Sequence, residues 1–341
     1  MKKVGLLLLS LLLSVSVLII PAAGCMVEPE TETLTKTDIR TITSTEIITE
    51  TITETITETV SQFLVIDDLG REVAVPAEAM RIVSLAPSNT EILFALGLED
   101  RVYGVTEWCD YPPEAMSKEK VGGYADVDLE KIIAINPDLI LAEDLHKAEV
   151  IPALEDLGYP VLALVPHNMQ EVIDSITMVG MLTGTSDTAE QITDDMSQRV
   201  QAVTDATAGL SQEDRLRVLY VVWHDPVMSV GSDTRIHELI EIAGGTNIAE
   251  IGGEGYPTLS LEEIISLNPQ VIIVNTEDYE GGDASLQAIL NEERLSNVDA
   301  MVNGQVYGIN ADLTNRPTPR IVDGLELMAQ MIHPELFGAV Q

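Results

Sequence analysis

The sequence predicts an α/β protein of two lobes, each built on a parallel β-sheet, with one or two long helices between them. The main observation is an internal repeat, because residues 128–141 recur as residues 260–273 with half of the positions identical and no gap. Each copy is an apolar helical stripe followed by a buried-type strand, and strand–helix–strand order favours parallel sheets. The offset between the copies far exceeds the repeats of about 20–50 residues that build solenoids.

The chain begins with a predicted export signal at residues 1–24. Lys2 and Lys3 precede an uncharged apolar run at 5–20, which is short for a membrane span of about 20 residues. The next residues, Ala23-Gly24-Cys25, resemble the lipobox of exported lipoproteins, in which the cysteine is acylated after cleavage. An uncleaved signal anchor is the alternative, and both interpretations place the rest of the chain outside the cytoplasm.

A low-complexity tether is predicted at residues 25–62, between the membrane and the folded body. It is rich in Thr, Glu and Ile and has no Gly or Asn to turn a hairpin, so we expect an extended, solvated segment. With Cys25 lipidated, Cys109 is the one remaining cysteine and no intramolecular disulfide can form. The fold must therefore depend on its hydrophobic core.

The composition excludes several classes of function. Lys plus Arg number 18 against 56 Asp plus Glu, which gives a formal net charge of -38, so nucleic acid is excluded as a partner. The 5 His residues are scattered, unlike the clustered ligands of a zinc or manganese carrier. Motifs of P-loop, serine-hydrolase and zinc-protease sites are absent. We therefore expect a binding protein with no catalytic activity and no cofactor of its own.

The N-terminal lobe is predicted at residues 63–167. A strand at Ile82–Leu85 precedes a helix at Thr90–Leu96. Ser88 and Glu91 have the spacing of a capping box, in which each side chain satisfies a backbone donor at the start of a helix. The first copy of the repeat completes this lobe.

Both copies of the repeat carry the same start and stop signals. The helices begin at the N-cap candidates Asp128 and Ser260, and each ends at Asn-Pro. The strands Leu139–Ala142 and Val271–Asn275 follow. These local signals predict that the two lobes arose by duplication.

The second lobe is predicted at residues 211–341, after a connecting helix at 168–210 that Gly184 interrupts. Strand Arg217–Val222 and helix Ile236–Ala243 are the counterparts of the first strand and helix of the N-terminal lobe. A final helix, which Arg320 opens, ends the chain.

Aromatic side chains gather on Gly- and Pro-rich loops that follow the predicted strands. A cleft between the lobes, at the carboxyl ends of the strands, is the expected ligand site in such a fold. Exposed rings there suit a large, flat, partly apolar ligand, although each ring by itself is equally compatible with local packing. The candidates are Trp108, Tyr111, Tyr124, Trp223 and Tyr256. His224, beside Trp223, either coordinates a ligand metal or donates a hydrogen bond.

The stretches Arg81–Glu91, Cys109–Pro113, Leu129–Ile132 and Pro319-Arg320 resemble the substrate-binding proteins of ABC importers for vitamin B12, haem and ferric siderophores. The resemblance covers residues 63–337 and is strongest to the vitamin B12-binding branch. It implies two Rossmann-like lobes joined by a long rigid helix, with a ligand cleft between them and modest closure. It also implies a protein that delivers its ligand to an ABC permease with ATPase subunits. Together with the lipobox-like residues, we expect a monomer that is exported and lipid-anchored to the outer face of the cytoplasmic membrane, or located in the periplasm.

The resemblance also implies roles for single residues. Trp108 stands where an aromatic ring packs on the corrin face, and Tyr124 where a second ring enters the cleft. The stretch Asp312–Arg316 falls on a loop that contacts the edge of a corrinoid, and Arg316 could meet a ligand carboxylate. The transported ligand is then cobalamin or a related corrinoid, with a ferric siderophore or haem as the alternative.

Glu130 and Glu262 occupy equivalent positions in the two copies of the repeat. A carboxylate in the first turn of a helix stabilises the helix. The resemblance implies a second role, in which these two acids, one per lobe, dock onto arginines of the permease. A surface adhesin on a stalk is the distant alternative.

Overall fold

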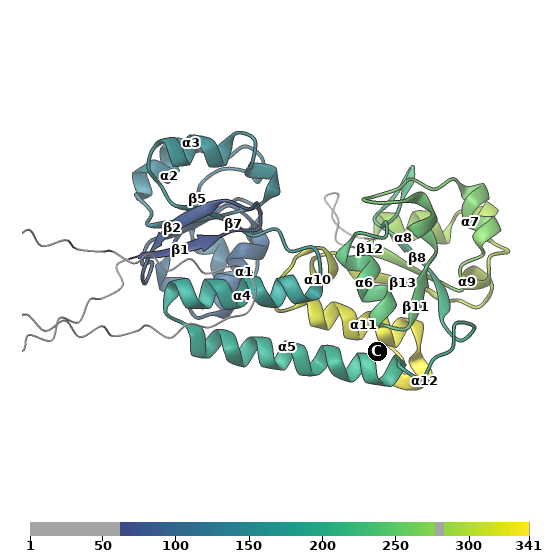
Figure 1. Ribbon diagram of the computed structural model, residues 1–341. Helices are drawn as coiled ribbons and strands as arrows, with labels where there is room; N and C mark the ends of the chain where they lie inside the picture. Colours follow the sequence, from purple (N-terminus) through teal and green to yellow (C-terminus); the bar gives the residue numbers. More distant parts are fainter. Residues whose placement is uncertain (1–61, 277–282, 341) are drawn as a thin grey trace, which may run out of the picture.

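The computed structural model describes residues 62–276 and 283–340. Two α/β lobes lie side by side, and helix α5 (Ser186–Thr207) runs along one side of both (Figure 1). The predicted fold class is confirmed. The predicted signal peptide, the lipidated Cys25 and all but the last residue of the tether fall outside the described residues. None of the described helices is long and apolar enough to cross a membrane.

The N-terminal lobe is built on a parallel sheet with the strand order β5-β4-β3-β6-β7. The central strands β3 and β6 are fully buried, as expected for a parallel sheet that helices cover on both faces. A separate antiparallel hairpin, β1-β2, begins the described chain. The elements are β1 (Gln62–Ile66), β2 (Glu72–Pro76), β3 (Ile82–Ser84), α1 (Pro87–Ala95), η1 (Glu99–Arg101), β4 (Val102–Val105), η2 (Pro113–Ser117), β5 (Glu119–Lys120), α2 (Leu129–Ile135), β6 (Leu139–Ala142), η3 (Asp144–His146), α3 (Val150–Asp156) and β7 (Val161–Ala163).

The C-terminal lobe repeats this plan around a parallel sheet with the order β11-β8-β12-β13. A short antiparallel hairpin, β9-β10, follows the central strand β8. The elements are β8 (Leu216–Val221), β9 (Trp223–His224), β10 (Val227–Met228), α6 (Arg235–Ile242), β11 (Gly245–Asn247), η4 (Ile248–Gly252), α7 (Leu261–Leu267), β12 (Val271–Thr276), α8 (Ala284–Leu290), η5 (Glu293–Leu295), α9 (Asp299–Val302), β13 (Val306–Asn310), α10 (Asp312–Asn315), α11 (Ile321–Ile332) and α12 (Pro334–Phe337).

The repeated segment has the same local structure in both lobes. Asp128 and Ser260 are the N-caps of α2 and α7, and each side chain accepts a hydrogen bond from the backbone N–H three residues later, at 3.1 and 3.2 Å. Asn136 and Asn268 end the helices in the left-handed conformation, with φ of 53° and 46°. Asn tolerates this conformation better than most residues. The predicted helix starts and stops are confirmed.

A pair of equivalent arginines extends the similarity between the lobes. Arg81 precedes β3, and its Nη2 donates to the carbonyl of Ile135 at 2.6 Å. Arg217 in β8 donates through Nε to the carbonyl of Leu267 at 3.2 Å. Each guanidinium thus satisfies a carbonyl at the C-terminus of a repeat helix, where positive charge is favourable. The duplication therefore includes side-chain contacts as well as topology.

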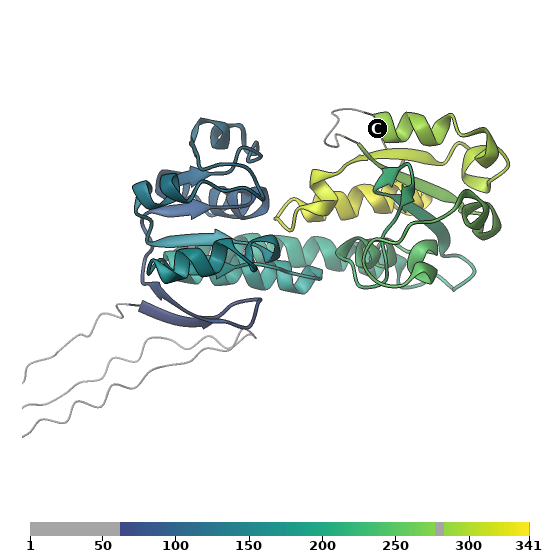
Figure 2. The same ribbon diagram turned by 90° about the horizontal axis from the view of Figure 1, so that it is seen from above.

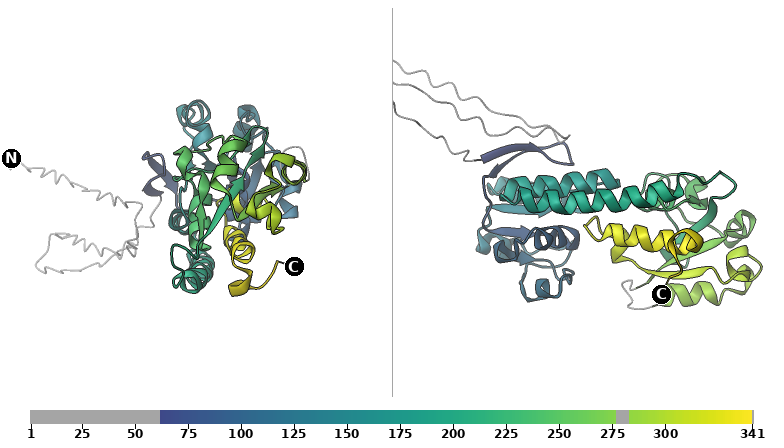
Figure 3. Two further views of the ribbon diagram at one scale, coloured as in Figure 1. Left: turned by 90° about the vertical axis from the view of Figure 1, so that its right-hand side faces the viewer. Right: turned by 90° about the horizontal axis from the view of Figure 1, so that it is seen from below.

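The connection between the lobes consists of two helices, which is one of the two possibilities that the sequence left open for residues 168–210. Helix α4 (Met169–Thr183) ends at Gly184, whose φ of 71° closes the helix, and α5 then returns alongside α4. Figures 2 and 3 show the two helices side by side, with α11 next to them in the C-terminal lobe. Gly184 decides this arrangement because few other residues adopt a left-handed conformation at low cost.

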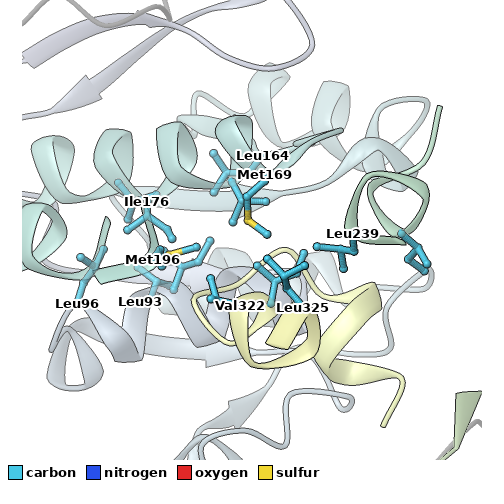
Figure 4. Packing of buried hydrophobic residues seen from close by; sticks show 14 of the residues in the cluster. Leu93, Leu96, Leu164, Met169, Ile176, Met196, Leu239, Val322 and Leu325 are labelled. Atoms are coloured by element: carbon cyan, nitrogen blue, oxygen red, sulfur yellow. The ribbon is translucent and has the colours of Figure 1, made fainter. Parts of the chain in front are cut away.

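One hydrophobic cluster continues from lobe to lobe through the connecting helices (Figure 4). Leu93 of α1 belongs to the N-terminal lobe, whereas Leu239 of α6 and Val322 of α11 belong to the C-terminal lobe. Ile176 of α4 and Met196 of α5 lie between them in the same cluster. Because this packing is continuous, separating the lobes would expose apolar surface at about 25 cal/mol per Å².

The predicted capping box at the start of α1 is wrong. The N-cap is Ala86, which has no capping side chain, and Pro87 occupies the first turn. The Ser88 hydroxyl donates to Glu143 at the end of β6, and Glu91 is turned toward the C-terminal lobe. Tertiary contacts therefore replace the local pair that the spacing suggested.

Candidate functional site

A buried carboxylate joins the two lobes. Glu91 of α1 is 3% exposed and accepts hydrogen bonds from two arginines of the C-terminal lobe. Arg320 reaches it through Nε at 2.8 Å and Nη2 at 2.7 Å, and Arg316 through Nη1 at 3.0 Å. A paired, bidentate geometry of this kind gives strong, directional contacts. The spatial relation of α1 to α10 and α11 is therefore specified by charge as well as by packing.

Two further acids complete this cluster. Arg316 Nη1 lies 2.8 Å from Asp110 of the N-terminal lobe, and its Nε lies 2.9 Å from Asp312. Burial alone would lower the pKa of Arg316, but the hydrogen bond with Asp110 and the charge of Asp312 raise it. Burial raises the pKa of Asp312. For Asp110 the desolvation is outweighed by Arg316, and its pKa is lowered. We call these residues, with Glu91 and Arg320, the interlobe ion cluster.

Tyr111 lies beside the interlobe ion cluster. The Arg320 guanidinium covers its ring at 3.6 Å from the centroid, a cation–π geometry that fixes the ring. A pocket of about 470 Å³ opens here between the lobes, lined by Phe94 and Tyr111 on one side and by Pro319 and Arg320 on the other. Tyr111 therefore contacts a protein cation, and its predicted role toward a ligand stays a prediction.

The remaining aromatic candidates of the N-terminal lobe lie on the loops after β4 and β5. Trp108 is 51% exposed. Tyr124 is half-buried, and its hydroxyl donates to the carboxylate of Glu143. The ring of Tyr124 meets the edge of the His146 ring at 5.7 Å. Trp108 is thus accessible to solvent, whereas Glu143 and His146 hold the side chain of Tyr124 in place.

The C-terminal lobe presents its candidates on the β9-β10 hairpin and on a glycine-rich loop. The rings of Trp223 and His224 are 4.7 Å apart. Trp223 Nε1 donates to the Asp225 carbonyl at 2.9 Å, and His224 Nδ1 is hydrogen-bonded to Ser285 at 3.0 Å. Tyr256 is 57% exposed on the loop before α7. The predicted role of His224 toward a ligand metal stays a prediction.

Arg235 of α6 connects this side to the N-terminal lobe. Its Nη1 donates to the carbonyl of Pro166, just before α4, and its Nη2 donates to the carbonyl of Asn315 at 2.8 Å. Burial lowers the pKa of Arg235, while the nearby Tyr256 and Glu143 act in the opposite direction. Arg235 therefore joins α6 to the segment before α4 and to the end of α10.

Glu130 and Glu262 are exposed in the first turns of α2 and α7. Figure 1 draws both helices on the side of the lobes away from α5. Neither carboxylate takes part in an ion pair among the described residues. The two side chains are therefore available to a partner on the same side of the molecule.

Sequence reasoning missed Glu143, Asp110, Arg235 and the role of Glu91 between the lobes. The position of Glu143 in the sequence was a signal, because it follows a fully buried strand directly. Trp223 has a similar position in the second lobe, two residues after the end of β8. For Glu91 the signal was an acid within a run that is otherwise apolar. The four-residue spacing of Arg316 and Arg320 was a further signal, in a chain with few cations.

The sequence profile of the periplasmic binding protein family matches residues 82–313. The chain belongs to this family. Its matched region runs from β3 to α10 and so includes both lobes. Membership makes the chain an extracytoplasmic binding protein and not an enzyme, as the sequence predicted.

Two relatives are similar to this protein over most of the chain. The ABC transporter substrate-binding lipoprotein YvrC of Bacillus subtilis is 33% identical over 280 residues, which cover 80% of this chain and 87% of YvrC. The vitamin B12-binding protein of Vibrio cholerae serotype O1 is 30% identical over 261 residues, which cover 74% of this chain and 89% of that protein. The predicted family resemblance is confirmed.

Solved structures agree with the two-lobe fold. The crystal structure of the Vibrio cholerae vitamin B12 binding protein BtuF superimposes with a TM-score of 0.65 at 30% identity, covering 75% of this chain and 98% of BtuF. The periplasmic heme-binding protein BhuT, solved with two hemes, has a TM-score of 0.67 at 24% identity, covering 75% of this chain and 98% of BhuT. At that identity the likeness to BhuT concerns the fold alone.

Proposed function

We propose that the protein captures cobalamin or a related corrinoid between its lobes and delivers it to the permease of an ABC importer. The observation that carries this proposal is the similarity to a vitamin B12-binding protein over nearly the whole length of that relative. The exposed rings of Trp108 and Tyr256 support it, because a corrin offers a large flat face to aromatic side chains. Haem and ferric siderophores are the alternative ligands.

The N-terminal sequence and the stalk support a lipid-anchored location on the outer face of the cytoplasmic membrane. In this proposal Cys25 carries the lipid, and residues 26–62 hold the folded body at a distance from the bilayer. The relative YvrC is itself named a lipoprotein. The partner permease and its ATPase subunits supply the energy, and the binding protein acts as a monomer.

Isothermal titration with cyanocobalamin, haemin and a ferric siderophore tests this proposal. One-to-one binding of cyanocobalamin at micromolar affinity or tighter is the expected result. Binding of haemin or the siderophore alone would keep the transport role and reject the corrinoid. No binding of any of the three would contradict the proposal and favour an adhesin.

Replacing Trp108 by alanine is expected to weaken cobalamin binding about tenfold. Loss of one ring–ring contact costs about 0.5–1.5 kcal/mol beyond the lost apolar contact area, and tenfold corresponds to about 1.4 kcal/mol. The matched control is Tyr103→Ala, because Tyr103 is also exposed, at 41%, but lies within β4. Equal affinities for both variants and the unmodified protein would exclude Trp108 from the ligand site.

A further inference from the structure

Glu143 lies at the edge of the N-terminal sheet where the carboxyl ends of the strands predict the ligand cleft. It follows β6 directly, at the carboxyl end of that strand. The hydroxyls of Ser88 and Tyr124 donate to its two carboxylate oxygens. Tyr124 is one of the rings predicted to contact the ligand. The carboxylate of Glu143 is therefore hydrogen-bonded to a predicted ligand-binding side chain.

The backbone around Glu143 is fixed by a buried histidine. His146 is 0% exposed, and its Nδ1 accepts a hydrogen bond from the Glu143 N–H at 3.1 Å. Because Nδ1 is the acceptor, the proton of a neutral ring is on Nε2, which then donates to the Tyr124 carbonyl at 2.9 Å. Burial lowers the pKa of His146, which favours this neutral form. Glu143 and Tyr124 are therefore held in a defined relation before any ligand binds.

The Glu143 carboxylate has no ion-pair partner within the described chain. The neutral hydroxyls of Ser88 and Tyr124 donate to it, and its side chain also accepts from the backbone N–H of His146 in a capping box. A carboxylate offers about four lone-pair sites on its two oxygens, so acceptor capacity remains after these bonds. A ligand group that donates a hydrogen bond can use that capacity, whereas a ligand carboxylate would meet a like charge at short range.

Two of the three arginines of this region are already paired with protein carboxylates. Arg316 and Arg320 pair with the acids of the interlobe ion cluster, whereas Arg235 donates through Nη1 and Nη2 to the carbonyls of Pro166 and Asn315 and keeps a buried Nε with no hydrogen-bond partner among the described residues. A carboxylate-bearing ligand would have to displace a protein carboxylate to pair with Arg316 or Arg320. A neutral ligand rich in amide N–H groups would not.

We infer that Glu143 is a specificity-determining residue that selects corrinoids bearing amide side chains over tetrapyrroles bearing carboxylates. The inference depends on the proposed function, because it names the chemical class of ligand for the same site. Cobalamin and cobinamide carry primary amides around the corrin ring, and cobyrinic acid carries carboxyl groups on the same ring. Haem likewise carries two carboxylates. The selection acts on the periphery of the ligand and not on its metal.

The test compares dicyanocobinamide with dicyanocobyrinic acid. Both ligands have the same corrin ring and the same metal, and they differ in the groups at the edge of the ring. Their dissociation constants are measured by titration calorimetry on the full mature chain in detergent. The unmodified protein is expected to bind the amide ligand at least 100-fold more tightly. Glu143→Gln is expected to narrow this ratio about tenfold, because the amide keeps the size of the side chain and removes its charge.

The control variant is Asp144→Asn, which removes the same charge one residue later. Asp144 is exposed, and within the part of the chain that the structure describes its one ion pair is with Lys147, at 3.8 Å. The ratio should therefore stay that of the unmodified protein. Thermal melting checks the fold of each variant, and Glu143→Ala replaces Glu143→Gln if the latter does not fold. An unchanged ratio in the Glu143 variant overturns the inference. Failure of the unmodified protein to bind either corrinoid overturns the proposed function instead.

Discussion

The double variant Glu130→Lys, Glu262→Lys is expected to lower ligand uptake about 100-fold or more while leaving ligand affinity unchanged. Truncating one member of a close interfacial charge pair costs about 2–5 kcal/mol, and each 1.4 kcal/mol is a factor of ten. Two pairs, one per lobe, would together exceed a factor of 100. Lysine would also bring a positive charge toward the arginines expected on the permease.

The measurements are uptake of labelled ligand in cells and binding of the purified protein to its permease in lipid nanodiscs. Glu190→Lys with Asp194→Lys is the matched control, because both acids are exposed on α5, away from α2 and α7, and the change in net charge is the same. The control should take up ligand normally. Normal uptake by the Glu130/Glu262 variant would show that these acids do not form the docking surface.

The second large effect is expected from Glu91→Gln, which should lower the free energy of unfolding by about 3 kcal/mol. Removing one partner of a buried ion pair costs about 3–5 kcal/mol, because the remaining charge is left unpaired. The low end applies here, since Arg316 keeps Asp110 and Asp312 after the substitution. Arg320, in contrast, loses both of its hydrogen bonds to a charged oxygen.

Calorimetry should show this loss as a fall in Tm of about 6–12 °C, at about 2–4 °C per kcal/mol for a chain of roughly this size. Glu99→Gln is the control, because Glu99 is an exposed acid that follows α1 closely in the chain. Like Glu91, it lines the pocket between the lobes beside Tyr111. A Glu91 variant as stable as this control would show that the interlobe ion cluster contributes little. Small-angle scattering of the same variants would show whether the lobes also separate.

The interlobe ion cluster and the shared core bear on how the protein handles its ligand. In addition to apolar packing through α4 and α5, the lobes are joined by Glu91, Arg316 and Arg320. Opening the lobes widely would break both sets of contacts. Ligand capture in this protein is therefore expected to need only small rearrangements of the loops that carry Trp108 and Tyr256, in agreement with the modest closure that the family resemblance implied.

The repeat, the parallel sheets and the helix boundaries within each copy could be predicted from the sequence. Their determinants are local, because an N-cap such as Asp128 acts within three residues and Asn136 ends the same helix. The exposed positions of Glu130 and Glu262 follow from the same local pattern, since the first turn of an amphipathic helix presents its polar side to solvent. Gly184 could likewise be recognised as an interruption of the helical pattern at residues 168–210, although the sequence left open whether one or two helices form there.

Tertiary structure alone decided which side chains meet between the lobes. Glu91 lies 225 residues from Arg316 and 229 from Arg320 in sequence, and Glu143 lies 55 residues from Ser88. The local spacing of Ser88 and Glu91 pointed to a capping box, but each side chain gains a stronger partner elsewhere. A buried carboxylate must be paired with an opposite charge, because burying it unpaired costs much free energy. This cost exceeds the stabilisation that one helix cap provides, which is about 1 kcal/mol. Short-range hydrogen bonds and periodicity therefore determined the two lobes of this protein, while the cost of burying charge determined how they are joined.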